Sequence, residues 1–206
     1  MMRRESSTVV AVAGDVQEAV LTEVSRSPNV SLIRPPETAG DPLEQGAQAL
    51  RKAAGSASPY VLVAADPLAA VAAEWRAMWD ITQQPHGGAA FERRAREALK
   101  AWQARRFELP DYYLILARSH PADAGDSAPG LYLGPFRAAR PHRVAVVPVT
   151  DATQPSAQAA GVLAALRALP YGPWWPPLGE LLDVARRFYA GGLAGGTGNL
   201  AAPAPG

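Results

Sequence analysis

The sequence contains no cysteine among its 206 residues, and only two of its 20 basic residues, Lys52 and Lys100, are lysines. Without cysteine the chain has no disulfide, no thiol nucleophile and no thiolate metal site. The 20 basic residues are balanced by 19 acidic ones, and a net charge of +1 provides no global field that attracts nucleic acid. No apolar run approaches the roughly 20 residues that a membrane-spanning helix needs. The sequence therefore predicts a chain without disulfides and without a membrane span.

Motifs for cofactor binding and for nucleophilic catalysis are absent as well. Only Gly14 follows the first apolar segment, so the G-x-G-x-x-G pattern of dinucleotide-binding proteins is missing. No G-x-S-x-G occurs, and the glycine-rich residues 191–198 lack the lysine of a phosphate-binding loop. His86, His120 and His142 fall in three different predicted loops without the spacing of zinc ligands. We therefore expect no cofactor and no metal ion.

What the sequence does contain is a regular alternation of short apolar segments with amphipathic ones, and 48% of its residues are hydrophobic. The predicted strands are residues 8–13, 30–34, 60–64, 112–117 and 143–149, and the predicted helices are residues 16–26, 42–54, 67–79, 91–106, 155–169 and 178–189. Strands that alternate with helices form βαβ units and a parallel sheet. We expect an α/β fold: one three-layer domain with a mostly parallel five-stranded sheet of Rossmann-like or flavodoxin-like order and helices on both faces. Residues 91–149 are the least regular, and we place a possible antiparallel edge strand there.

The domain boundaries follow from composition. Residues 1–7 are expected to be a flexible N-terminus, residues 8–190 a single α/β domain, and residues 191–206 a disordered tail of glycine, alanine and proline. Residues 9–13 are too short for the apolar core of a signal peptide, so we expect a cytoplasmic protein.

Two helix boundaries carry specific signals. Asp41, Pro42 and Glu44 have the residue types of an N-cap, a first helical position and a capping box. The stretch Pro85-His86-Gly87-Gly88 is expected to interrupt the helical pattern between residues 67 and 106.

Polar residues follow several of the predicted strands, where parallel sheets bind their ligands. Asp15 and Asp66 follow the first and third strands, and Ser119 and His120 follow the fourth. The two aspartates resemble the acidic pocket of response-regulator receiver domains, which implies a magnesium or phosphoryl site. Receivers carry paired acids after the first strand and a lysine after the last, whereas this chain has Gly14 before Asp15 and no such lysine. The other interpretation is that Asp15 and Asp66 only cap the helices that follow them.

Basic side chains gather in two places. The first group lies on the predicted helix 91–106 and consists of Arg93, Arg94, Arg96, Lys100, Arg105 and Arg106. The second group precedes the fifth strand and consists of Arg137, Arg140, His142 and Arg143. Such groups could contact phosphates or the acidic surface of a partner. Because Glu92 and Glu97 interrupt the first group, we expect no nucleic-acid binding.

The most unusual segment is Tyr171-Gly172-Pro173-Trp174-Trp175-Pro176-Pro177. Its three prolines exclude both a helix and a central strand. Adjacent side chains of an extended segment point in opposite directions, so Trp174 and Trp175 cannot both enter one core. We expect one tryptophan to pack under the last helix and the other to cover a groove or meet a partner.

Two functions remain open from the sequence. The first is a non-catalytic cytoplasmic α/β protein that acts as an assembly, adaptor or structural subunit. It would bind a protein partner or a second copy of itself through Trp174, Trp175, Arg137, Arg140 and Arg143. The alternative is a small nucleotide- or phosphate-binding enzyme whose site contains Asp15, Asp66, Ser119 and His120.

Overall fold

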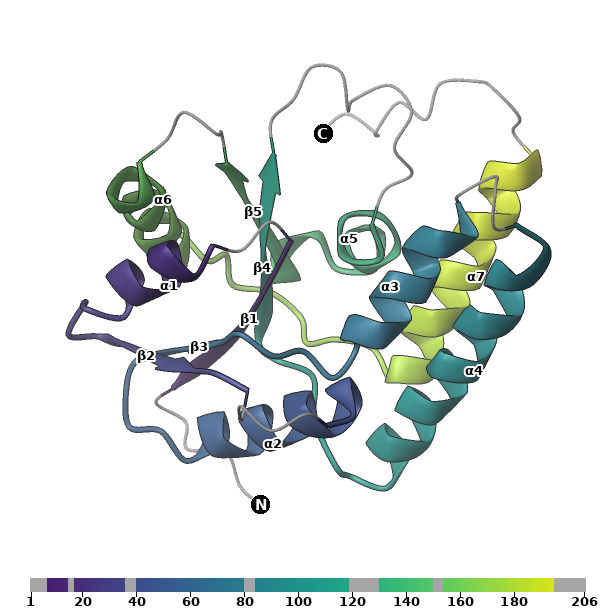
Figure 1. Ribbon diagram of the computed structural model, residues 1–206, viewed down its shortest axis with the longest axis horizontal. Helices are drawn as coiled ribbons and strands as arrows, with labels where there is room; N and C mark the ends of the chain where they lie inside the picture. Colours follow the sequence, from purple (N-terminus) through teal and green to yellow (C-terminus); the bar gives the residue numbers. More distant parts are fainter. Residues whose placement is uncertain are drawn as a thin grey trace.

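The structure is a computed structural model that describes residues 7–14, 17–35, 40–79, 84–118, 130–149 and 154–194 (Figure 1). Its strands are β1 (Thr8–Gly14), β2 (Val30–Ile33), β3 (Tyr60–Val63), β4 (Tyr112–Arg118) and β5 (Val144–Val149). Its α-helices are α1 (Glu18–Val24), α2 (Pro42–Ala54), α3 (Ala69–Met78), α4 (Gln84–Gln103), α5 (Arg137–Ala139), α6 (Pro155–Arg167) and α7 (Leu178–Ala194). One turn of π-helix, η1 (Tyr132–Phe136), and one short 3₁₀ turn, η2 (Pro141–Arg143), flank α5. Within these residues, all five predicted strands are present.

The five strands form a single parallel sheet in the order β2-β3-β1-β4-β5. This confirms the predicted α/β fold class, while the antiparallel edge that we expected within residues 91–149 is wrong. In that stretch β4 pairs with β1 on one side and with β5 on the other, both in parallel. Compared with the first five strands of the Rossmann order 3-2-1-4-5-6, the second and third strands have exchanged places. Pro148 lies in β5 at the sheet edge, where a strand tolerates a proline because no partner needs its missing N–H.

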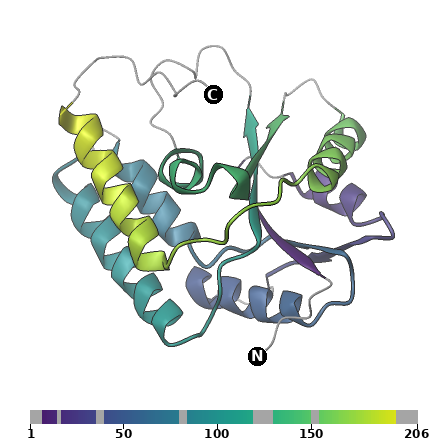
Figure 2. The same cartoon turned by 180° about the vertical axis from the view of Figure 1, so that it is seen from behind.

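Helices cover both faces of the sheet and make three layers. In Figures 1 and 2, α1 and α6 lie on one side, while α2, α3, α4, α5 and α7 lie on the other. Alternate residues of β1 serve the two faces: Val9 and Ala11 join the core under the larger helical layer, and Val10 and Val12 join the core under α1 and α6. A strand with both faces covered explains the uninterrupted apolar run in the sequence.

The larger layer is held together by aromatic side chains. Trp75 of α3 is fully buried and makes edge-on contacts with Trp79, Phe91 and Tyr189, with ring centroids 5.7, 5.7 and 6.3 Å from its own. Its contacts therefore join α3, α4 and α7 into one unit. Their position beside one another is visible on the right of Figure 1.

Two boundary predictions were wrong in their details. Helix α2 begins at Pro42 as expected, but Asp41 makes no side-chain capping bond, and Glu44 binds Arg51 and Arg106 instead. Helices α3 and α4 are separate, as expected, but residues 85–88 lie in the first turns of α4 and not between the two helices. A proline next to a helix start costs little, because the first N–H groups of a helix have no partner within it. Helix α7 runs from Leu178 to Ala194.

Candidate functional site

The carboxyl end of β1 is the topological switch point of this sheet. The connection after β1 leads to α1 on one face, whereas those after the neighbouring β3 and β4 lead to α3 and η1 on the other face. Ligands of open α/β sheets bind at such points. Gly14 ends β1 here with a φ of +93°, and a Cβ at this position would collide with the carbonyl oxygen of Leu116. This glycine is therefore required by the close approach of β4.

Asp66 follows β3 at this end of the sheet, and its carboxylate is occupied by three donors. The Leu68 N–H and the Tyr113 hydroxyl donate to Oδ1 at 3.1 and 3.2 Å, and the Tyr132 hydroxyl donates to Oδ2. Only 8% of Asp66 is exposed. Burial raises the pKa of this carboxyl group, and its three hydrogen bonds act in the opposite direction. Asp66 does bond to an N–H at the start of α3, as a cap would, but it also joins β3 to β4 and to η1.

The two tyrosines that bind Asp66 are themselves buried. Their rings stack at 4.5 Å with an interplanar angle of 21°. Burial, followed by the nearby Asp66, raises the pKa of both hydroxyls well above their ordinary value, so they remain protonated donors. A Cβ on Gly46 of α2 would collide with the backbone of Asp66 and Pro67, so α2 also closes over this turn. The Asp66 carboxylate is thus part of the core and is not open to a ligand.

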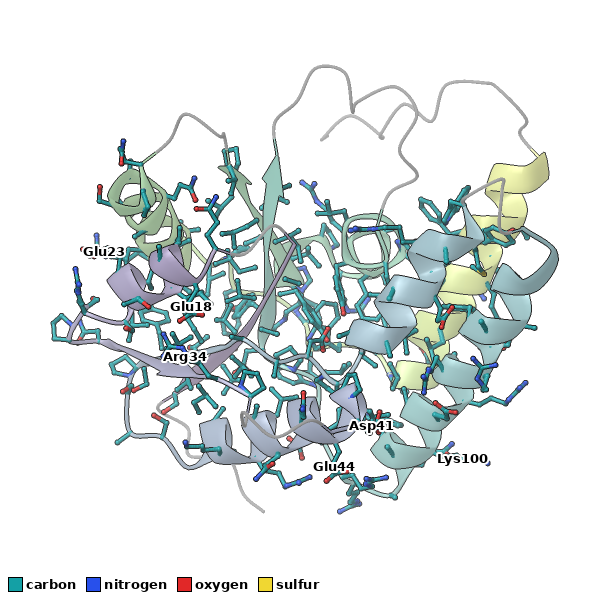
Figure 3. All side chains as sticks on the ribbon, viewed as in Figure 1. Glu18, Glu23, Arg34, Asp41, Glu44 and Lys100 are labelled. Atoms are coloured by element: carbon teal, nitrogen blue, oxygen red, sulfur yellow. The ribbon has the colours of Figure 1, made fainter. Side chains whose placement is uncertain are left out.

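The other residues of the predicted enzymatic site cannot be placed beside Asp66. Asp15, Ser119 and His120 lie outside the described residues. Glu18 of α1 accepts a hydrogen bond from Arg34 Nε at 2.8 Å, which links α1 to the end of β2 (Figure 3). Among residues 7–14, 17–35, 40–79, 84–118, 130–149 and 154–194, no three His, Asp or Glu side chains are grouped so that they could hold a metal ion.

At the opposite end of the sheet, residues 170–177 cross the amino-terminal ends of β4 and β5 on their way from α6 to α7 (Figure 2). Trp175 anchors this segment because it is only 5% exposed and donates from Nε1 to the Pro110 carbonyl at 2.7 Å. Its ring contacts Tyr113 and Phe136 with centroid distances of 5.8 and 5.9 Å. Trp175 is therefore the tryptophan that packs into the core, next to the start of α7.

The backbone carbonyls of the same segment are held by the second basic group. Arg143 donates to the carbonyls of Gly172 and Pro173 at 2.5 and 2.9 Å, and His142 Nε2 donates to Pro173 at 2.8 Å. Arg140 Nε donates to the Trp174 carbonyl at 2.8 Å. The structure therefore brings the basic residues and the tryptophan segment together, although the sequence places them some 30 residues apart. Three consecutive carbonyls of the segment are fixed by side chains.

Arg143 is the buried member of this basic group, with only 7% of it exposed. Its guanidinium lies between the rings of Tyr112 and Trp174, 4.8 and 5.1 Å from their centroids, and it also donates to the Asp111 carbonyl at 3.2 Å. A buried arginine with these contacts stabilises the fold and has little surface to offer a partner. Arg137, by contrast, is exposed on α5.

The outer side of the segment presents large aromatic side chains. Tyr171 is completely exposed and Trp174 is 44% exposed, and with Val146 of β5 they are the exposed large hydrophobic residues of the described chain. The backbone that carries them is held in place by Arg140, His142 and Arg143. We call Tyr171 and Trp174 the aromatic surface.

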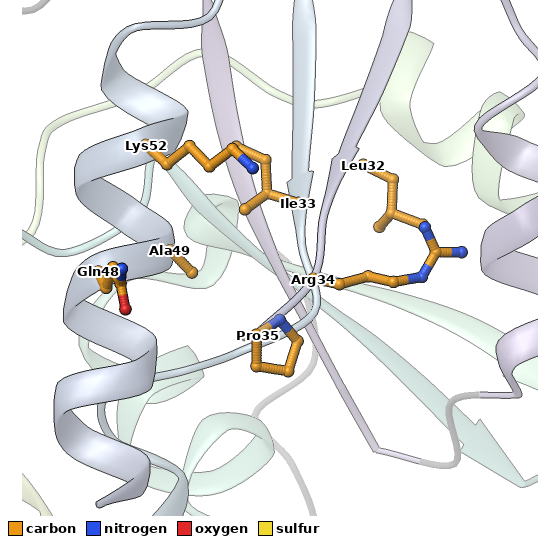
Figure 4. A pocket seen from close by; sticks show the side chains of 7 residues that line it. All are labelled: Leu32, Ile33, Arg34, Pro35, Gln48, Ala49 and Lys52. Carbon is orange, nitrogen blue, oxygen red and sulfur yellow. The ribbon is translucent and has the colours of Figure 1, made fainter. Parts of the chain in front are cut away.

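The surface of the described residues includes the following two hollows. One, with a volume of about 410 Å³, lies between the end of β2 and α2, and Figure 4 shows Lys52 and Gln48 reaching it from α2 while Arg34 points away from that helix. Since Arg34 is bound to Glu18, the hollow does not gather a set of converging polar groups. The second hollow, of about 260 Å³, lies between Arg140 and the outer side of α7, beside the aromatic surface.

The basic side of α4 is partly neutralised. Within α4, Arg94 binds Glu97 at 2.9 Å, and beyond its end Arg106 binds Glu44 of α2. Glu92 is bound by Arg186 of α7 at 2.8 Å and so does not neutralise the arginines of α4. Lys100 points away from the body of the molecule in Figure 3. This helix therefore carries a mixed charge pattern rather than a continuous basic patch. In the part of the chain that the structure describes, no helix is long and apolar enough to cross a membrane.

No protein-family model, no curated protein and no solved structure matches this chain, so a functional argument must rest on its own geometry. Sequence reasoning missed the partnership of Asp66 with Tyr113 and Tyr132. The one available signal was that buried tyrosines within apolar segments need a hydrogen-bond partner. It also missed that Arg143 is buried, because an arginine before a strand gives no sign of what its guanidinium will contact.

Proposed function

We propose that this chain is a non-catalytic cytoplasmic protein that acts as an assembly, adaptor or structural subunit by binding another protein chain. The binding site is the aromatic surface, Tyr171 and Trp174, with Arg140, which donates to the Trp174 carbonyl, and the exposed Arg137 of α5 as its basic residues. The partner is a protein rather than a nucleic acid, because acidic side chains interrupt the basic side of α4.

The observation that supports this proposal is the difference in exposure between the adjacent residues Trp174 and Trp175. Trp175 is 5% exposed and anchored to the Pro110 carbonyl, whereas Trp174 is 44% exposed beside a fully exposed tyrosine. Exposed aromatic residues on a fixed backbone are typical centres of protein interfaces. The prolines and the bonds from Arg140, His142 and Arg143 have already ordered this backbone, so docking costs little further conformational entropy.

The enzymatic alternative receives no comparable support from the described residues. Of its four predicted site residues, only Asp66 is described, and its carboxylate is buried and bonded to three donors. A nucleotide or a metal ion would have to displace Tyr113 and Tyr132 from the core to reach it.

The test is affinity capture from an extract of the cells that make the protein, with self-association measured in parallel by sedimentation. The double variant Tyr171→Ser/Trp174→Ser should lose most of the bound protein while its melting temperature stays close to that of the wild type. Val146→Ser is the matched control, because it removes an exposed apolar side chain from β5 and should bind normally. The proposal is wrong if the double variant binds as the wild type does, or if the wild type binds neither itself nor another protein.

A further inference from the structure

The outer side of α7 carries a row of polar residues next to the aromatic surface. Glu180, Asp183, Val184 and Arg187 all line the hollow of about 260 Å³, together with Ala139, Arg140 and Pro176. Residues spaced at i, i+3, i+4 and i+7 share one face of a helix. Leu181, Leu182 and Ala185 point the other way and are fully buried. This row, Glu180 to Arg187, is therefore the solvent side of α7, and we call it the outer face.

The charges of the outer face balance each other and are arranged in order along the helix. Glu180 lies near the N-terminal end and Arg187 lies two turns later. Neither forms an ion pair with another described residue of the chain. Between them, Asp183 is bound to Arg186 at 2.6 Å, and the same Arg186 also binds Glu92 of α4 at 2.8 Å. The outer face thus has one acidic end, one basic end and a centre whose acidic charge is partly compensated.

Such an arrangement is complementary to itself. When two copies of a helix pack antiparallel about a two-fold axis, each residue faces the one at the mirrored position along the helix. With the axis beside Asp183 and Val184, Glu180 faces the partner's Arg187, and Arg187 faces the partner's Glu180. Opposite charges meet twice, while the two Asp183 side chains near the axis are only partly offset by Arg186 of each copy, which also binds Glu92. We infer that the outer face of α7 is a homodimer interface whose partner is a second copy of this chain.

The inference rests on the proposed function, since it specifies the protein that the aromatic surface binds. The aromatic surface precedes α7 in the chain, and Arg140 connects the two, because it donates to the Trp174 carbonyl and also lines the hollow. In an antiparallel pair, the end of this segment at Pro176 lies toward the other copy's α7. Apolar contact from Pro176 and Val184, which both line the hollow, then adds to the two ion pairs, which alone would contribute little.

The experiment is a charge exchange in the full-length chain, with the dissociation constant measured by sedimentation velocity over a range of concentrations. Glu180→Arg alone, or Arg187→Glu alone, places like charges opposite each other and should weaken dimerisation at least about tenfold. The double variant Glu180→Arg/Arg187→Glu should restore the dimer to within a few-fold of the wild type. Arg167→Glu, a charge reversal at an exposed position of α6 in the other helical layer, should have no effect.

The outcomes separate this inference from the proposed function. Rescue by the charge exchange supports a second copy, because both partners change together only in a homodimer. A wild type that stays monomeric, or a double variant that is weaker than both single variants, overturns the homodimer. If the chain is monomeric but Tyr171→Ser/Trp174→Ser still loses a captured protein, the proposed function holds and the partner is a different protein. If the charge exchange rescues the dimer but Tyr171→Ser/Trp174→Ser changes neither assay, the outer face is the interface and the proposed role of the aromatic surface is wrong.

Discussion

The two ends of the sheet differ in whether their polar and aromatic side chains are buried or exposed. At the carboxyl end of β3, an acidic side chain is buried and fully bonded, and its neighbours are two stacked tyrosines. At the amino-terminal ends of β4 and β5, basic side chains hold a proline-rich segment whose Tyr171 and Trp174 face solvent. The end that binds ligands in most α/β sheets is closed around Asp66, and the opposite end offers the exposed surface.

This difference shows that a polar residue at a strand end has to be judged by its partners. Asp66 has the position of a ligand-binding acid, but two hydroxyls and one N–H satisfy it. Trp174 lies in a segment that belongs to no helix or strand, yet the bonds to its carbonyl and those of its neighbours define its position. The predictions below test whether each end has the role that these contacts indicate.

The largest effect on stability is expected at Trp175. Trp175→Ala removes a buried ring that contacts Tyr113 and Phe136, together with the bond to the Pro110 carbonyl. A buried aromatic residue replaced by alanine costs about 3–5 kcal/mol. Urea denaturation followed by circular dichroism measures this loss. A loss below about 1 kcal/mol would show that the segment is not anchored to the core.

The second-largest loss of stability is expected at Arg143. Arg143→Lys keeps the positive charge but lacks the planar fork that reaches the carbonyls of Gly172, Pro173 and Asp111. Losing these charge-assisted hydrogen bonds to partly exposed carbonyls costs about 1–3 kcal/mol, and the aromatic surface should lose its fixed position. Arg137→Lys is the matched control, because Arg137 is exposed and the same change should alter stability by less than about 0.5 kcal/mol. Equal effects of the two substitutions would contradict the structural role of Arg143.

The helices, the strands and the fold class could be predicted from the sequence because each depends on a local residue pattern. The apolar runs of the strands and the amphipathic pattern of α2 and α7 predict their elements directly. The strand order and the turn of π-helix at Tyr132–Phe136 depend on contacts between distant residues, as the bond from Tyr132 to Asp66 illustrates. In η1, the Phe136 N–H bonds to the Leu131 carbonyl, five residues back, beside Pro135, which has no N–H.

The candidate site could be predicted only in part from the sequence. Two adjacent tryptophans among prolines already require that their side chains separate, but only the surroundings decide which one is buried. Pro110, Tyr113 and Phe136 surround Trp175, and none of them is near it in the sequence.

A smaller effect is expected on the pH dependence of stability. The pKa of Asp66 is raised in the folded state by burial, so Asp66 contributes stability below the ordinary value of 3.8 that is lost as the pH rises through its folded pKa. Asp66→Asn cannot titrate. The stability of the wild type relative to this variant should therefore be greatest at low pH and fall as the pH rises. Urea denaturation of both proteins between about pH 3 and about pH 8 measures the difference.

The comparison between the two proteins removes the contribution of the other acids. The pKa values of Glu44 and Glu92 are lowered by bonds to arginines, which gives the opposite pH dependence, but both proteins contain them. A stability difference that is constant with pH would mean that Asp66 is not buried as the structure has it.

The smallest effect on stability is expected at Trp174, and its measurement tests the central claim most directly. Trp174→Ala should lower the free energy of unfolding by no more than about 1 kcal/mol, because the ring is 44% exposed and its contact with the Arg143 guanidinium lies at the surface. The same variant should raise the dissociation constant of the complex at least about tenfold when denaturation and sedimentation are measured on one preparation. If Trp174→Ala instead costs as much stability as Trp175→Ala, or if association is unchanged, the segment only braces the fold and the aromatic surface is not a binding site.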